Sequence, residues 1–215
     1  MFYFNYILKM GNNSNSSHKL KPQKLNINST IKLKPKDKRY SFQLVMVGKS
    51  FVGKTCISNR YITGDFDDFY RTTFGREFNL KGLNFHNQNI CLQLYEIPWR
   101  YESSSFFNFL PKNAHGIIFV YDVSDKCSFD SICNLNKVTE NNACEVLVGN
   151  KCNTNNRVIT EEMGKNLADE LGMNFFETSA KSGKNIDELF LSLTEEIFKT
   201  FYPEDLQTLL RSSIE

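Results

Sequence analysis

The sequence contains no apolar run long enough to span a bilayer, and its six cysteines form no CxxC pair and no zinc-like spacing. These absences argue against a helical membrane protein, a zinc module and a disulfide-stapled secreted domain. The apolar start, Met1 to Lys9, lacks both the basic region and the small-residue cleavage site of a signal peptide. We therefore expect free thiols in a reducing compartment, and a cytoplasmic protein.

Acidic residues are scarce at the start of the chain. Residues 1–40 contain nine Lys or Arg and a single acid, Asp37, which gives this segment a net charge of +8. The other 17 basic and 23 acidic side chains give the remainder a net charge of −6. Because residues 10–40 are rich in Asn, Ser and Lys and have little to bury, we expect residues 1–40 to be a basic, disordered extension.

From residue 41 onward, strand and helix patterns alternate. At 215 residues and 40% hydrophobic content, the chain can bury one α/β core but not a second large one. Strands are predicted at residues 42–47, 76–83, 89–95, 117–122, 145–149 and 174–177. Helices are predicted at residues 54–62, 103–113, 127–138, 160–171 and 185–200, with a short polar tail over residues 201–215. This alternation favours a three-layer sandwich around a mostly parallel sheet.

The most informative motif is Gly48-Lys49-Ser50-Phe51-Val52-Gly53-Lys54-Thr55, which follows an apolar strand and opens a predicted helix. Glycines let backbone N–H groups curl around a phosphate, and the helix N-terminus adds partial positive charge. Lys54 is placed to reach the β- and γ-phosphate oxygens, and the Thr55 hydroxyl to bind Mg²⁺. The motif predicts a nucleotide phosphate site; the alternative is a glycine turn with a solvated lysine.

Three later segments follow this loop in a characteristic order. Asn150-Lys151-Cys152-Asn153 resembles a guanine-binding NKxD loop, and residues 177–181 (ETSAK) resemble a second base-contacting loop. Residues 69–75 (FYRTTFG) resemble a first switch, with Thr73 at the position that closes onto Mg²⁺ and the γ-phosphate. Together with residues 114–123 and Ser128-Phe129, these segments resemble the Ras-superfamily small GTPases, and among them the Rab family, over about residues 41–200.

This resemblance implies the P-loop NTPase fold of small G proteins, with a six-stranded, mostly parallel sheet and helices on both faces. It implies GTP or GDP with Mg²⁺ as ligands, and the metal would contact Thr55, Thr73 and Glu96. It also implies effector or regulator proteins at the switch face, and we expect a monomer with no nucleic acid bound. The implied nucleotide contacts outside residues 48–55 are Thr73, Asn150, Lys151, Asn153, Ser179, Ala180 and Lys181.

Asn153 departs from the family pattern, which has Asp at this position. The carboxylate of Asp accepts two hydrogen bonds from guanine, whereas an Asn amide offers one acceptor and turns donors toward the other contact. Losing a charge-assisted bond costs roughly 1.5–3 kcal/mol, so guanine affinity should fall. Xanthine carries an acceptor where guanine has its amine, and would suit Asn153 better. The alternative is drift in an Asn-rich chain whose nucleotide binding is already weakened.

The second switch departs further. Where the family has a short Asp-Thr-Ala-Gly-Gln run, this chain has residues 96–100 (EIPWR). Glu96 keeps a carboxylate for water-mediated Mg²⁺ contact, one methylene longer than Asp. Trp99 replaces a mobile glycine, and Arg100 replaces the glutamine that orients the attacking water, a task that needs an acceptor. We therefore expect slow or absent GTP hydrolysis, with Arg100 acting as a built-in arginine finger as the alternative.

Rab proteins usually end in cysteines that are prenylated, whereas no cysteine follows Cys152 in this sequence. We therefore expect no prenyl anchor. The basic residues of the extension could instead provide a weaker, peripheral contact with an anionic membrane, at about 1 kcal/mol per basic side chain.

Three functional hypotheses are compatible with these residues. The first is a guanine-nucleotide-binding, Rab-like switch in vesicle trafficking or signalling. The second is a non-cycling pseudo-GTPase that uses the same fold as an interaction module. The third, an ATP-dependent P-loop enzyme such as a kinase, is disfavoured because no substrate lid or second catalytic segment is visible. Intact Lys54, Thr55 and Thr73 favour the first hypothesis, and the departures at residues 96–100 and at Asn153 favour the second.

Overall fold

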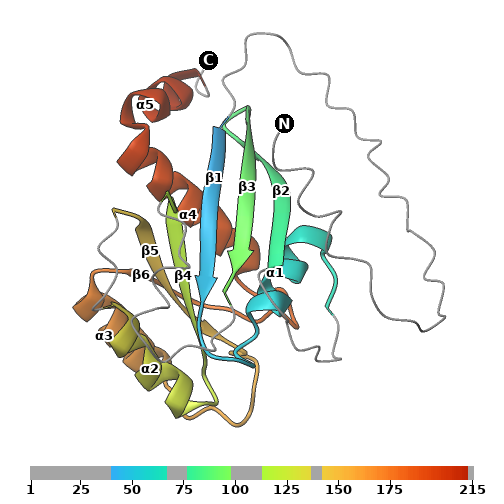
Figure 1. Cartoon of the computed structure of the whole chain (residues 1–215), viewed down its shortest axis with the longest axis vertical. Coiled ribbons are helices and arrows are strands. Elements are labelled where there is room, and N and C mark those ends of the chain that lie inside the picture. Colours follow the sequence, from blue (N-terminus) through green and yellow to red (C-terminus); the bar gives the residue numbers. More distant parts are fainter. Residues whose placement is uncertain (1–39, 67–76, 98–112, 137–141, 213–215) are drawn as a thin grey trace, which may run out of the picture. The chain divides into compact units, whose positions relative to one another are not determined.

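The structure is a computed structural model that describes residues 40–66, 77–97, 113–136 and 142–212 (Figure 1). The strands are β1 (Tyr40–Val47), β2 (Glu77–Phe85), β3 (Gln88–Glu96), β4 (Gly116–Asp122), β5 (Cys144–Asn150) and β6 (Asn174–Glu177). The helices are α1 (Lys54–Thr63), α2 (Lys126–Asn136), α3 (Glu161–Leu171), α4 (Ile186–Phe201) and α5 (Pro203–Ser212).

The six strands form one sheet in the order β2-β3-β1-β4-β5-β6. Only the β2–β3 hairpin is antiparallel, and every other neighbouring pair is parallel. The predicted fold class is therefore confirmed. Every predicted strand, and every predicted helix except that at residues 103–113, agrees with its observed counterpart to within two residues at either end. The helix predicted at residues 103–113 lies almost entirely outside the described residues.

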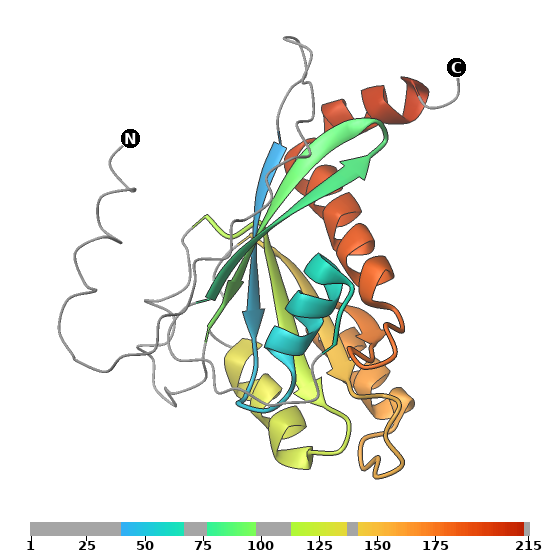
Figure 2. The ribbon, with the colours of Figure 1, turned by 90° about the vertical axis from the view of Figure 1, so that its right-hand side faces the viewer.

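Two apolar clusters cover the two faces of the sheet, and Figure 2 shows α4 running along one of these faces. Because successive strand side chains point to opposite faces, Phe42, Leu44 and Met46 of β1 pack with α1 and α4, whereas Val45 and Val47 pack with α2 and α3. Both faces of β1 are buried, and this explains why its sequence is apolar throughout its second half. The result is the three-layer arrangement that the alternating pattern predicts.

The segment predicted as a short polar tail contains a helix instead. Pro203 stands at the first position of α5, where its missing N–H removes no hydrogen bond. Leu206 and Leu209 lie three residues apart on one side of α5, and each is only 7% exposed because it packs into the core cluster that also contains Phe198. The polar composition of the tail hid this narrow apolar stripe.

Among the described residues, no helix has both the length and the apolar character needed to cross a membrane.

His115 joins the start of β4 to β1 within an aromatic environment. Its Nδ1 accepts a hydrogen bond from the backbone N–H of Gln43 at 3.1 Å, and its ring lies 5.5 Å from the ring of Phe42 and 5.4 Å from that of Phe201. Burial lowers the pKa of His115 below its ordinary value of 6.5, because the surroundings disfavour the charged imidazolium. Protonation would also remove the acceptor that Gln43 uses.

This lowered pKa predicts a loss of stability in mild acid. Because the unfolded chain takes up the proton at a higher pH than the folded protein, the free energy of unfolding should fall as the pH drops below about 6.5. The variant His115→Gln keeps an acceptor for Gln43 but cannot titrate, so its stability should fall less over the same range. Denaturant midpoints measured from about pH 7.5 to about pH 5 test this. Parallel pH profiles for the two proteins would contradict it.

Candidate nucleotide-binding site

The loop between β1 and α1 passes so close to neighbouring segments that two of its positions admit only glycine. A Cβ atom on Gly48 would lie 2.1 Å from the backbone oxygen of Val120 in β4. Gly53 has a φ of 95°, and its Cβ would lie 2.4 Å from Nδ2 of Asn150. The glycines of the motif are therefore required by the fold, and they leave backbone N–H groups accessible to a ligand.

Lys54, the first residue of α1, turns back over this loop. Its Nζ donates hydrogen bonds to the backbone oxygens of Gly48 at 2.7 Å and Lys49 at 2.9 Å. Burial lowers the pKa of Lys54 from 10.5 to about 8, and the negative charge of Glu96 partly opposes this effect. A phosphate beside this ammonium would add negative charge to that of Glu96 and favour the charged form of Lys54 further.

Thr55 and Glu96 come together from two elements that are far apart in the sequence. The Thr55 hydroxyl donates a hydrogen bond to Oε2 of Glu96 at 2.5 Å. Glu96 ends β3, opposite Met46 of the adjacent strand β1, and is only 1% exposed. A hydroxyl and a carboxylate oxygen are hard ligands of the kind Mg²⁺ prefers. Since no group of three or more His, Cys, Asp or Glu gathers in the described part of the chain, a metal here would also need oxygens from a bound phosphate or water.

Asn150 connects the phosphate loop to the ETSAK loop. Its Nδ2 donates to the backbone oxygen of Val52 at 2.8 Å. Its Oδ1 accepts from the Thr178 hydroxyl at 3.2 Å and from the backbone N–H of Ala180 at 3.4 Å. Asn150 is 1% exposed, so both ends of its amide are directed into the protein. Asn150, which the sequence predicts as a base contact, therefore links the two loops that would hold the ligand.

Asn153 and Ser179 form the polar end of the expected base site. Asn153 is exposed, and its Oδ1 accepts a hydrogen bond from the buried hydroxyl of Ser179 at 2.8 Å. The same hydroxyl accepts from the backbone N–H of Ser182 at 3.1 Å, so its own proton is available for Asn153. This network fixes the orientation of the amide and leaves Nδ2 of Asn153 as a donor for a ligand.

Two of the lysines expected at the site, Lys151 and Lys49, point toward side chains of the protein. Nζ of Lys151 forms an ion pair with Asp122 at 2.6 Å, and its backbone has a left-handed φ of 62°. Nζ of Lys49 donates to Sγ of Cys127 at 3.0 Å, on the first turn of α2. Lys49 is therefore directed toward α2, and its backbone remains part of the phosphate loop.

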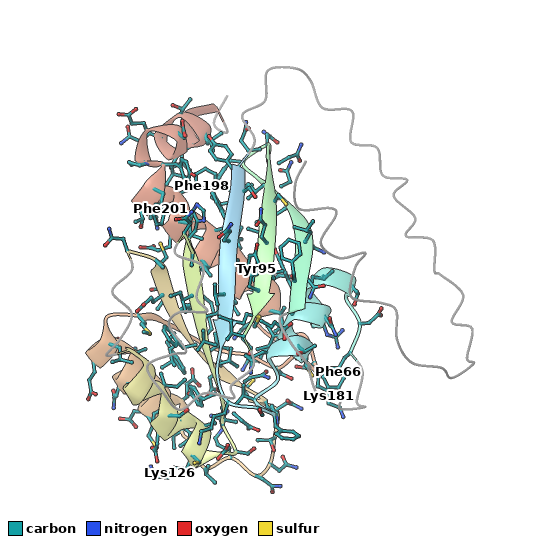
Figure 3. All side chains as sticks on the ribbon, viewed as in Figure 1. Phe66, Tyr95, Lys126, Lys181, Phe198 and Phe201 are labelled. Carbon is teal, nitrogen blue, oxygen red and sulfur yellow. The ribbon has the colours of Figure 1, made fainter. Side chains whose placement is uncertain are left out.

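Sequence analysis missed two residues that border the base site. Arg60 of α1 donates from Nε to the backbone oxygen of Ala180 at 2.7 Å and from Nη2 to that of Lys181 at 2.6 Å. Phe66 lies beside them: its ring centre is 6.0 Å from Cζ of Arg60 and 5.9 Å from Nζ of Lys181, and Figure 3 shows Phe66 and Lys181 side by side. An aromatic residue shortly after the polar end of α1 was the available signal, but no local pattern connects it to a loop about 115 residues later.

Four further residues complete the comparison with the sequence predictions. Phe51 lies on the phosphate loop with a left-handed φ of 71° and is 64% exposed. A bulky residue pays roughly 1–2 kcal/mol in this conformation, which glycine adopts freely. Thr73 of the expected first switch, and Trp99 and Arg100 of the second, lie outside the described residues.

The glycine-rich loop, the lysine above it and the adjoining strand order define a P-loop nucleotide-binding protein. The family model described as the Ras family matches residues 43–199. The chain is 37% identical over 161 residues to Ras-related protein Rab-13 of Bos taurus, covering 73% of this chain and 79% of that protein. It is 35% identical over 163 residues to Ras-related protein RIC1 of Oryza sativa subsp. japonica (74% and 81%), and 34% identical over 165 residues to GTP-binding protein ypt2 of Schizosaccharomyces pombe (74% and 82%). The chain belongs to the Ras family and is a Rab-like small GTPase by sequence.

The contact between Gly53 and Asn150 predicts the effect of a single added methyl group. In Gly53→Ala, the new Cβ would displace the Asn150 amide and break its hydrogen bond to Val52. We expect a loss of about 2–4 kcal/mol in the free energy of unfolding and a loss of nucleotide binding. Gly64→Ala is the matched control, because Gly64 also has a positive φ of 78° but faces open space. Equal stability losses in the two variants, measured by denaturant unfolding, would refute this account.

Proposed function

We propose that this protein binds a guanine nucleotide together with Mg²⁺ and acts as a regulatory switch in vesicle trafficking or signalling. The observation that carries the proposal is the meeting of three ligand-binding parts at one edge of the sheet: the glycine loop under Lys54, the Thr55–Glu96 oxygen pair, and the loop around Ser179. Each part alone occurs in unrelated proteins, but their combination matches the phosphates, the metal and the base of one nucleotide.

The roles of the residues follow from their contacts. Backbone N–H groups of residues 48–55 would surround the phosphates, and Lys54 would move from the carbonyls it now contacts to phosphate oxygens. Thr55 and Glu96 would serve the metal, with Thr73 as a further ligand when a γ-phosphate is present. Bound Mg²⁺ would neutralise phosphate charge, which is its usual contribution in nucleotide sites.

The base would lie between Phe66 and the loops that carry Asn153 and Ala180. Phe66 offers an aromatic surface at one side, and Asn153 offers an amide at the polar edge of the purine. Because Ser179 donates to Oδ1 of Asn153, the amide presents its N–H groups to a ligand. Such a donor matches the 2-carbonyl of xanthine and meets the 2-amino group of guanine unfavourably. We therefore propose weakened guanine affinity and a shift toward xanthine nucleotides.

Calorimetric titration with GDP, GTP and XTP, each with Mg²⁺, tests both nucleotide binding and base preference. We expect XTP to bind more tightly than GTP, and Asn153→Asp to reverse this order by roughly ten- to a hundredfold. Asn156→Asp, which adds the same charge at a nearby exposed position, is the control and should leave the order unchanged. Tighter binding of GTP than XTP by the unaltered protein would refute the base preference, and no binding of any of the three would refute nucleotide binding.

We further propose that GTP hydrolysis is slow or absent, on the basis of the sequence at residues 96–100. Trp99 and Arg100 stand where the family has glycine and glutamine, and an arginine cannot accept the hydrogen bond needed to orient water. Positioning supplies most of the rate in this reaction, so losing it should affect the chemical step more than binding.

Single-turnover hydrolysis separates the chemical step from nucleotide release. The double variant Trp99→Gly/Arg100→Gln should hydrolyse bound GTP at least about tenfold faster than the unaltered protein. Lys126→Gln, which removes one positive charge from the exposed first turn of α2, serves as a control and should leave the rate unchanged. If Arg100 is a built-in arginine finger, the double variant will instead be slower, and the proposal fails.

A partner surface is available on β2, the strand that follows the expected first switch in the sequence. Phe78 and Leu80 lie on the same side of β2 and are 50% and 56% exposed, and the ring of Phe78 lies 5.0 Å from that of Tyr95 on β3. This apolar surface supports effector or regulator binding, and it would equally serve a non-cycling pseudo-GTPase. The peripheral membrane contact of residues 1–40 and the monomeric state remain predictions from the sequence.

A further inference from the structure

We propose that the aromatic ring of Phe51 contacts the sugar of a bound nucleotide and slows its release. The inference rests on the proposed nucleotide binding and concerns how long the ligand stays bound. Phe51 stands in the phosphate loop, where its backbone is left-handed with a φ of 71°. This conformation is costly for any residue with a Cβ atom, and costly backbone conformations cluster at ligand-binding sites. The ring is therefore a candidate for ligand contact.

Contacts on both sides of Phe51 fix the path of the loop. Before it, Gly48 passes so close to β4 that an added Cβ would lie 2.1 Å from the backbone oxygen of Val120. After it, the backbone oxygen of Val52 accepts a hydrogen bond from Nδ2 of Asn150 at 2.8 Å, and the side chain of Val52 is buried in the core. Position 51 is therefore held in its left-handed conformation by neighbouring residues.

Phe51 lies where the phosphate loop meets the segment that leads to the base site. The phosphate end of the expected ligand is at Lys54, and its base end is at Asn153, which accepts a hydrogen bond from Ser179. Asn150 contacts the phosphate loop one residue after Phe51 and stands three positions before Asn153. A nucleotide that reaches from Lys54 to Asn153 would therefore have its sugar beside this junction.

The ring of Phe51 is accessible to a ligand at this junction. Two neighbouring side chains of the loop are directed elsewhere, Lys49 toward Cys127 of α2 and Val52 into the core. Phe51 is 64% exposed, so most of its surface can be covered by a bound molecule. The carbon-bound face of a sugar is apolar, and packing it against a ring removes apolar area from water. Because this contact must break before the ligand leaves, it should lower the release rate.

Release rates of tritiated GDP and tritiated XDP test this contact, because a tritium label leaves the sugar unmodified. The full-length protein is loaded with either nucleotide and Mg²⁺ and then mixed with excess unlabelled nucleotide. Phe51→Asn removes the ring but tolerates a left-handed backbone, so release should be at least about fivefold faster. Phe51→Tyr keeps the ring and should release at the rate of the unaltered protein. The control is Leu210→Gln, which removes an exposed apolar side chain from α5 and should leave the rate unchanged.

Two further measurements separate a ligand contact from a role in the fold. Because Asn adopts the left-handed conformation more readily than Phe, ligand-free Phe51→Asn should have a denaturant midpoint no lower than that of the unaltered protein. In the complex of ¹³C-phenylalanine-labelled protein with unlabelled GDP or XDP, isotope-filtered NOE spectra should show cross-peaks between ring and sugar protons. Those cross-peaks that arise from Phe51 should be absent from Phe51→Asn.

Three results would overturn the inference while leaving nucleotide binding intact. The first is an equal release rate for the unaltered protein and Phe51→Asn, which would leave the exposed ring to a protein partner. The second is a lower denaturant midpoint for Phe51→Asn, which would make the ring a support of the fold. The third is the absence of any sugar cross-peak that depends on Phe51. If the unaltered protein binds neither GDP nor XDP, the inference and the proposed function fail together.

Discussion

The amide of Asn150 holds the two ligand loops in one geometry, and the rest of the site depends on it. A single buried side chain satisfies the backbone oxygen of Val52 in the phosphate loop and both Thr178 and Ala180 in the base loop. Without this amide, a buried carbonyl and a buried N–H would each lose a partner, at a cost of about 1–3 kcal/mol apiece. The glycine at position 53 follows from the same constraint, since any Cβ there would occupy the space of the amide.

The parallel sheet explains why Asn150 can reach both loops. β3, β1, β4, β5 and β6 follow one another in the sheet and all run in the same direction, so their carboxyl ends lie along one edge. The phosphate loop leaves β1 at this edge, Glu96 ends β3, and Asn150 ends β5. Two side chains then link distant segments by hydrogen bonds. Asn150 donates to the phosphate loop, and Arg60 of α1 donates to the base loop. Residues separated by about 100 positions in sequence thereby form one site, and local sequence patterns carry no information about these distances.

The limits of prediction from sequence follow the range of the interactions. Strand and helix positions were predictable because apolar periodicity is local, and the phosphate loop was predictable because its function depends on eight consecutive residues. The helix α5 was missed because two leucines in a polar segment become an apolar stripe only when Tyr202 and Phe198 are there to cover them. Asn150 was predicted as a ligand contact because residues 150–153 resemble a guanine-binding NKxD loop. Its burial and its hydrogen bonds to the two loops depend on where β5 ends relative to β1 and β6.

The departures of this chain from the family pattern share one physical feature. Glu96 accepts a hydrogen bond from Thr55, and Asn153 accepts one from Ser179, so each altered residue has a hydrogen-bonding partner within the protein. What changes is the group left for a ligand: a longer reach at the metal, and an amide donor at the base. Because both side chains form hydrogen bonds within the protein, we expect these substitutions to cost the fold little, whereas ligand chemistry can change by orders of magnitude. A scaffold braced through Asn150 and Arg60 can therefore tolerate change at its ligand-facing atoms without loss of its own structure. Altered ligand chemistry therefore does not by itself indicate that the domain is losing its fold.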